Sequence, residues 1–182
     1  MNTLPDYLRS NLSIISIGLN PSPISVDAGY YFANPRNRFW KALNGSRLVD
    51  VVFEPGEQAI QTLFTDYKIG FTDLVKRPSR MGNELRVADY KEWTPILKEK
   101  LLQYQPGIAW FQGKLTYQHY LKHAEDKDQK TTLGIQKNKI GKTYAFVTPN
   151  PSPANAKYSL EDLIKYYNDL VSFQVREAFG LG

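Results

Sequence analysis

Short apolar runs alternate with amphipathic stretches along most of the chain. The strands predicted from β-branched and aromatic runs span 13–18, 69–73, 107–111 and 143–147. The helices predicted from apolar residues at helical spacing span 37–43, 57–67, 89–103 and 114–122. Because strands that alternate with helices are typical of a parallel sheet covered on both faces, the pattern predicts an α/β fold with a mainly parallel central sheet.

The last predicted helix has the clearest start signal. Ser159 precedes Asp162 by three residues, which is the pattern of an N-terminal capping box. The apolar positions that follow share one helical face and are expected to be buried; they are Leu163, Tyr167, Leu170 and Val171.

Two loops show neither the helical nor the strand spacing of apolar residues. The first spans 19–35 and is interrupted by Pro21, Pro23 and Gly29, while the second spans 148–157. A polar stretch at 124–136 predicts an ordinary surface loop. Long aperiodic loops between ordered elements are often functional. Since ligands of parallel α/β sheets bind beyond the carboxyl ends of strands, and both loops leave strands at that edge, we expect the two loops to meet.

Composition narrows the class of protein. The 182 residues are 42% hydrophobic, enough for one domain over 1–182 with a real core, and the net charge of +5 is compatible with a polyanionic partner without identifying one. The absence of cysteine excludes disulfides, thiolate nucleophiles and thiolate-bound metal, and fits a reducing compartment. With neither a signal-peptide pattern nor a membrane-length apolar run, the expectation is a soluble cytoplasmic protein, or a nuclear one in a eukaryote.

The first loop combines an exposed amide with aromatic and basic residues. Gly18 permits close approach of a ligand and Pro21 holds Asn20 extended, although a simple turn is the commoner role of such residues. Aromatics interleaved with Arg36 and Arg38 suit base stacking and phosphate contacts. We expect Phe39 and Trp40 in the core; for Tyr30, Tyr31 and Phe32, which lie in the loop, a stacking role stands beside core packing as an alternative at least as well supported.

The second loop is stiff because it holds prolines at 149, 151 and 153. Stiffness suits an element that is pushed into a DNA helix, and a purely structural turn is the alternative. Other chemistry has little support. His119 and His123 have no partnering metal ligands and are expected at the surface, and there is no phosphate-cradling glycine loop or serine nucleophile elbow. We therefore expect no metal and no cofactor.

Three ordered segments resemble the mismatch-specific uracil/thymine branch of the uracil-DNA glycosylase superfamily. They are Gly18-Leu-Asn-Pro21, Phe32-Ala-Asn-Pro-Arg-Asn-Arg-Phe-Trp40 and Asn150-Pro-Ser152. The resemblance implies a three-layer α/β/α sandwich, a water-positioning role for Asn20 and a base-stacking role for Phe32. It also implies a base pocket formed with Gly18, Leu19, Pro21 and Ser22. The residues expected to contact DNA are Arg36, Arg38, Asn150, Pro151, Ser152, Pro153, Ala154, Asn155 and Lys157.

The sequence departs from that family pattern in two places. Ser22 and Pro23 stand where the family usually has a small residue, often glycine, and a residue other than proline. In the second loop, 153–156 reads Pro-Ala-Asn-Ala, where the family places a large Leu or Arg side chain that fills the space left by the flipped base. Either a weaker wedge acts here or another loop contributes, and opposite-base selectivity stays open.

The sequence therefore predicts a monomeric, monofunctional DNA glycosylase without a lyase nucleophile. Its expected partner is double-stranded DNA that contains uracil or a mismatched pyrimidine, including thymine or a modified base. Two alternatives stay open: a glycosylase for deaminated purines, and a catalytically silent DNA-binding module of the same fold. Asn20 argues against the silent module, because such a protein has no need of an exposed amide beside stacking aromatics.

Overall fold

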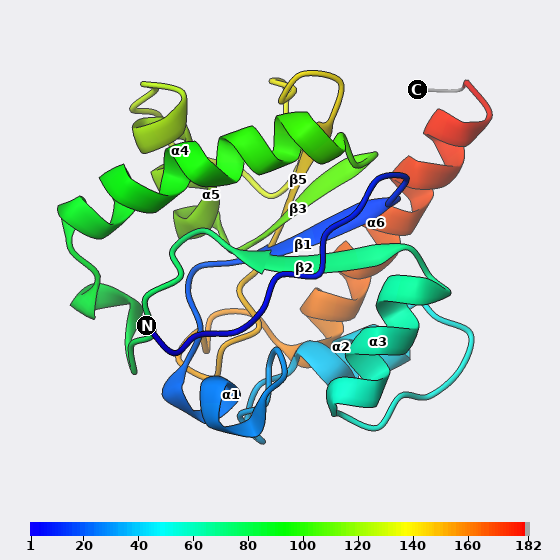
Figure 1. Cartoon of the computed structure of the whole chain (residues 1–182). Helices are drawn as coiled ribbons and strands as arrows, with labels where there is room; N and C mark the ends of the chain where they lie inside the picture. Colours follow the sequence, from blue (N-terminus) through cyan, green and yellow to red (C-terminus); the bar gives the residue numbers. More distant parts are fainter. Residues whose placement is uncertain (181–182) are drawn as a thin grey trace.

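A five-stranded sheet with helices on both faces organises the protein (Figure 1). The computed structural model describes residues 1–180. The strands are β1 (Ile14–Gly18), β2 (Ile69–Asp73), β3 (Ile108–Gln112), β4 (Gly134–Ile135) and β5 (Tyr144–Thr148), in the order β2-β1-β3-β5-β4. The helices are α1 (Pro23–Ala28), α2 (Phe39–Gly45), α3 (Glu57–Thr65), α4 (Val87–Tyr104), α5 (Lys114–Ala124) and α6 (Leu160–Ala178). All strand pairs are parallel except β4 with β5.

Alternation along each strand divides the apolar residues between two cores. Ile14 and Trp110 belong to the core shared with α2, α3 and α6, whereas Ile15 and Phe111 belong to the core shared with α4 and α5. Each fully buried side chain of this size stabilises the fold by about 1.5–3 kcal/mol relative to an exposed one. The three-layer α/β/α arrangement predicted from the sequence is therefore confirmed.

The first loop is more ordered than predicted, because it contains α1. The Ser22 side chain accepts a hydrogen bond from the Ser25 amide (3.1 Å), and Pro23 fits the first helical turn, where no intrahelical partner is needed for an N–H. Gly29 ends the helix in the left-handed conformation (φ 80°). The residues that interrupt periodicity are thus the start and stop signals of a short helix.

Some details of the other elements differ from the prediction, and one is confirmed. The stretch 124–136 is not wholly loop, since β4 pairs with the edge of β5. Helix α4 begins at Val87 and continues through Pro95. In α6, the Ser159–Asp162 capping box is confirmed by reciprocal hydrogen bonds of 2.8 and 3.1 Å. The buried face of α6 ends at Phe173, and Val171 is only half-buried.

The parallel register brings four strand ends to one edge. Gly18 pairs with Asp73, and Gln112 pairs with Thr148. The loops that follow these strands therefore lie on the same side of the protein, as expected. Among residues 1–180, no helix has both the length and the apolar character needed to cross a bilayer.

Candidate functional site

A cavity of about 380 Å³ opens at the carboxyl edge of the sheet, between loops that are distant in sequence. Its walls come from the N-terminal segment, the two loops predicted from sequence and the connection between β2 and α4. The lining residues are Leu4, Gly18, Leu19, Asn20, Pro21, Ser22, Ser25, Tyr31, Phe32, Asn34, Arg36, Asn37, Asp73, Ser79, Arg80, Met81, Gly82, Gln112, Asn150, Ser152, Pro153 and Ala154.

Asn20 is held by its amide nitrogen. Nδ2 donates to the Arg77 carbonyl oxygen (3.0 Å) and to Ser79 Oγ (2.7 Å), and the Ser79 amide donates in turn to the Pro21 carbonyl oxygen (3.2 Å). Within residues 1–180, the Asn20 amide oxygen accepts no hydrogen bond. The half-buried side chain therefore presents a fixed, free acceptor at the cavity wall.

Phe32 forms a supported aromatic wall of the cavity. Its ring stacks on Phe39 with a centroid distance of 4.0 Å and an interplanar angle of 17°, and its carbonyl oxygen accepts from Trp40 Nε1 (3.2 Å). The backbone of Phe32 is left-handed (φ 60°), a conformation that costs roughly 1–3 kcal/mol for a non-glycine residue. Strain of this kind is concentrated at functional sites.

The neighbouring tyrosines do not share this role. Tyr31 is buried, and its hydroxyl donates to the Pro5 carbonyl oxygen (2.9 Å) while its ring lies 5.6 Å from that of Phe71. Tyr30 is partly buried against the same core. The predicted stacking role is wrong for Tyr31, because core packing already occupies its ring. The core positions predicted for Phe39 and Trp40 are confirmed.

Asp73, which sequence reasoning missed, lies at the floor of the cavity. Its side chain is buried, and burial raises its pKa to about 6, although Lys76 Nζ lies 3.6 Å from Oδ2 and favours the charged form. Oδ1 lies so close to β1 that a Cβ at Gly18 would approach it to 2.7 Å. Glycine at position 18 therefore makes room for the carboxyl group. The feature of the sequence that could have identified Asp73 is a carboxylic acid at the end of an otherwise mostly apolar strand.

Gln112 is a second buried polar group at this floor. Its Nε2 donates to Ser16 Oγ (3.0 Å), while Oε1 has no partner within the described residues. A buried acceptor without a partner is destabilising, so its presence at a cavity wall fits a site that binds a donor group or an ordered water.

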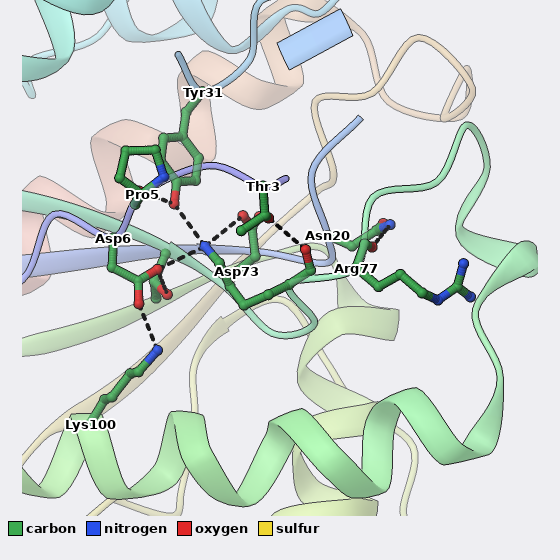
Figure 2. A network of polar contacts seen from close by, with 10 residues as sticks. Thr3, Pro5, Asp6, Asn20, Tyr31, Asp73, Arg77 and Lys100 are labelled. Carbon is green, nitrogen blue, oxygen red and sulfur yellow. Dashed lines mark hydrogen bonds and ion pairs between the residues drawn. The ribbon is translucent and has the colours of Figure 1, made fainter. Parts of the chain in front are cut away.

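A charged network fixes Lys76 beside Asp73. Lys76 Nζ lies 2.8 Å from Asp6 Oδ1, and Lys100 Nζ lies 2.6 Å from Asp6 Oδ2 (Figure 2). Burial alone would raise the pKa of Asp6, but the two ammonium groups outweigh it and the pKa is lowered. Thr3 Oγ1 donates to the Lys76 carbonyl oxygen (2.6 Å). The N-terminal segment therefore anchors the end of β2 on which the cavity floor depends.

The second loop is held from below by Arg38. Its guanidinium donates to the carbonyl oxygens of Tyr158, Ser152 (3.3 Å) and Asn155 (2.8 Å), and its backbone amide donates to Pro151 (3.1 Å). The sequence placed Arg38 among residues that contact DNA. The structure instead shows its charged group engaged with the loop backbone.

The cavity brings together most of the residues selected from sequence. Those in its wall are Gly18, Leu19, Asn20, Pro21, Ser22, Phe32, Arg36, Asn150, Ser152, Pro153 and Ala154. Pro151 is buried, and Asn155 and Lys157 border a neighbouring groove rather than the cavity. The residues of this wall that the sequence did not indicate include Ser79, Arg80 and Met81, because they come from a connection without any recognisable motif.

The two histidines are packed, not free at the surface. Their rings lie parallel to Tyr90, with centroid distances of 3.9 Å for His119 and 5.4 Å for His123, and both are half-buried. Burial lowers the pKa of each. Among residues 1–180, no group of three or more His, Cys, Asp or Glu side chains is arranged to hold a metal ion.

Residues 5–171 match the family model described as the uracil DNA glycosylase superfamily. The chain is also similar to a solution NMR structure of a candidate uracil DNA glycosylase from Methanosarcina acetivorans. The sequence identity is 21%, the TM-score is 0.57, and the match covers 97% of this chain and 98% of the other. At this identity, the structural match supports the fold alone.

Proposed function

Because the chain belongs to the uracil DNA glycosylase superfamily, we propose that it hydrolyses the N-glycosidic bond of uracil in mispaired double-stranded DNA. Membership supports a hydrolytic DNA glycosylase that acts in base excision repair. The preference for uracil in a mispair, and for thymine or modified pyrimidines beside it, is the finer part of the proposal. One chain supplies the whole cavity, so a monomer suffices.

The observation that carries this proposal is the orientation of Asn20. Its amide nitrogen is bound to the β2–α4 connection, and this leaves the amide oxygen for a solvent molecule in the cavity. An amide oxygen orients water but does not take its proton at neutral pH. In hydrolysis, the water oxygen bonds to C1′, the C1′–N bond breaks, and its electron pair leaves with the base. The water supplies one proton to the departing base and the hydroxyl to the sugar.

Since Asn20 is a weak base, the reaction depends on the leaving base and on an oxocarbenium-like sugar. This predicts slow turnover. No residue that acts as a lyase nucleophile is needed, because water breaks the bond.

The cavity also offers contacts for a base turned out of the helix. Phe32 provides a stacking face, and Asp73 in its neutral form offers one donor and one acceptor. Uracil presents O4 as an acceptor and N3–H as a donor, which matches a neutral carboxyl group. Hypoxanthine presents O6 and N1–H in the same pattern. This feature of Asp73 supports a deaminated purine as a second candidate substrate.

DNA contacts would come from the exposed rim. Arg36 is exposed at the cavity wall and suits a phosphate contact, while Lys157 and the Asn150–Asn155 segment form the adjoining surface. Arg38 contributes indirectly, by holding the shape of that segment.

The test is base release from duplexes that carry uracil, thymine or hypoxanthine opposite G or A, followed by alkaline cleavage of abasic sites. Wild type should act on G·U, and Asn20→Ala should reduce its single-turnover rate by about 100-fold or more, since one positioned group typically contributes 10²–10³. Asn138→Ala, which removes a half-buried amide outside the cavity, is the matched control. An Asn20→Ala rate within about threefold of wild type would contradict the mechanism.

A further inference from the structure

The connection between β2 and α4 projects an exposed tip at the rim of the cavity. Residues 80–84 are all exposed, and the Met81 residue is 50% exposed although its side chain is apolar. Met81 and Gly82 line the cavity on one side and a groove of about 890 Å³ on the other. The tip is therefore a ridge between two hollows, and its most prominent side chains are Arg80 and Met81.

The backbone of this tip is held firmly in place. Ser79 Oγ donates to the Met81 carbonyl oxygen (2.8 Å), and the Met81 amide donates to Glu84 Oε1 (3.1 Å). Arg77 binds both carboxylate oxygens of Asp89 at 2.8 Å and also donates to the Glu84 carbonyl oxygen (2.9 Å). The tip thus has a defined shape before any partner binds, which lowers the entropy lost on binding.

The tip lies against the first loop. A Cβ placed on Gly82 would lie 2.7 Å from Leu19 Cδ2, so the tip already rests on the first loop. Ser79 also accepts from Asn20, so one hydroxyl group ties the tip to the side chain that faces the cavity. Seating of the tip and orientation of Asn20 are therefore connected.

The opposite rim has no comparable side chain. The residues of the second loop that line the cavity end in Pro153 and Ala154, which are too small to fill the space left by a base in a stacked helix. Unbranched, polarisable Met adapts to irregular apolar gaps, and Met is among the side chains that insert between base steps. Arg80 makes no hydrogen bond or ion pair within residues 1–180, so its charge is available for a phosphate.

We propose that the Arg80–Met81 tip is the element that enters the duplex, with Met81 in the space vacated by the flipped base and Arg80 on the adjacent backbone. The partner is duplex DNA that has lost the stacking of one base. This inference rests on the proposed glycosylase function, and it assigns the wedge to the β2–α4 connection instead of the proline-rich loop.

The test compares Met81→Ala, Met81→Leu and Val87→Ala. Val87 is the matched control because it is an apolar side chain, 60% exposed, that borders the groove of about 890 Å³ but not the cavity. Single-turnover rates on G·U and A·U duplexes and on single-stranded uracil are measured. Met81→Ala should slow duplex reactions by about tenfold or more, with the larger loss on A·U, and leave the single-stranded rate within about twofold. Met81→Leu and Val87→Ala should stay close to wild type.

An equal loss on single-stranded uracil would overturn the proposal, since Met81 would then shape the base cavity rather than support flipping. Unchanged duplex rates would overturn it as well. Affinity for a duplex with an abasic site separates this inference from the proposed function, because it needs no base release. Met81→Ala should weaken that binding about tenfold relative to intact duplex, even if wild type releases none of the bases tested. Equal loss for both duplexes would refute the insertion of Met81.

Discussion

Two of the segments that border the cavity, the second loop and the connection between β2 and α4, reach a defined shape in different ways. The 149–157 loop is stiff because of its own prolines and is held from below by the Arg38 guanidinium, and its exposed side chains are small. The 77–84 connection has one proline and depends on hydrogen bonds donated by Arg77 and Ser79 and on one accepted by Glu84, yet it exposes the larger side chains. The second loop thus forms a rigid edge of the cavity, and the β2–α4 connection presents the larger exposed side chains. A rigid backbone and a bulky contact residue need not belong to the same segment.

Removal of the support under the second loop should produce the largest effect. Arg38→Ala deletes a charged donor of hydrogen bonds to three carbonyl groups, so the free energy of unfolding should fall by about 3 kcal/mol and base release should slow. Arg38→Lys should not restore stability, because an ammonium cannot reproduce the planar fork. Thermal unfolding measures the effect.

Arg36→Ala is the control for that comparison. Arg36 is exposed, so its loss should leave the melting temperature nearly unchanged. It should weaken DNA binding, and the slope of the logarithm of the binding constant against the logarithm of salt concentration should fall by about the amount expected for one phosphate contact. If Arg38→Ala instead behaves like Arg36→Ala, Arg38 binds DNA directly and does not brace the loop.

The contribution of the cavity floor to stability should depend on pH. Burial favours the neutral form of Asp73, whose pKa is about 6 in the folded protein against an ordinary value of 3.8. Asp73 therefore contributes stability that is present below pH 4 and is lost as the pH rises through 6. The free energy of unfolding of wild type minus that of Asp73→Asn should therefore fall as the pH rises from about 4 through 6.

Base release should follow the same titration. If neutral Asp73 reads the base, the wild-type single-turnover rate falls as the pH rises through about 6, relative to Asp73→Asn, in which an amide offers both a donor and an acceptor at every pH. Parallel pH profiles for the two proteins would show that Asp73 supports the fold of the floor without contacting the base.

A smaller effect is expected from enlarging the second loop. Ala154→Leu should raise the A·U rate by about threefold and the G·U rate by less, because the stronger pair has more flipping energy to recover. In a Met81→Ala background the gain should be larger, since both side chains would fill the same space. Single-turnover rates on both duplexes decide this. Equal gains in the two backgrounds would mean that the loops act in separate places.

The sequence predicted those parts of the fold that depend on local pattern. Apolar runs located β1, β2, β3 and β5, and the Ser159 cap located α6, because periodicity and capping act over a few residues. Short α1 was missed because its Ser22-Pro23 start and Gly29 stop were interpreted as loop signals. Asn20 and Phe32 were selected by motif, and the cavity indeed includes both.

Ser79, which the sequence did not indicate, and the loop-bracing role of Arg38, which the sequence placed among DNA contacts, both depend on contacts across long separations. Ser79 gains its importance from Asn20, 59 positions earlier, and Arg38 from carbonyl groups more than 100 positions later. A lone serine or arginine gives no local indication of such a partner. Tyr31 was misjudged for the same reason, since its burial depends on Phe71 and Pro5 rather than on neighbours in sequence.

The strand order has a consequence for how the protein is made. β1 is synthesised first but lies inside the sheet, between β2 and β3, so it stays without its second neighbour until Gln112 has left the ribosome. Pairing across such separations is slow, and an apolar strand with open edges is prone to aggregate in the meantime. The cavity itself needs Leu4 and Ala154 together. A nascent chain or proteolytic fragment that stops short of the second loop therefore lacks a complete cavity.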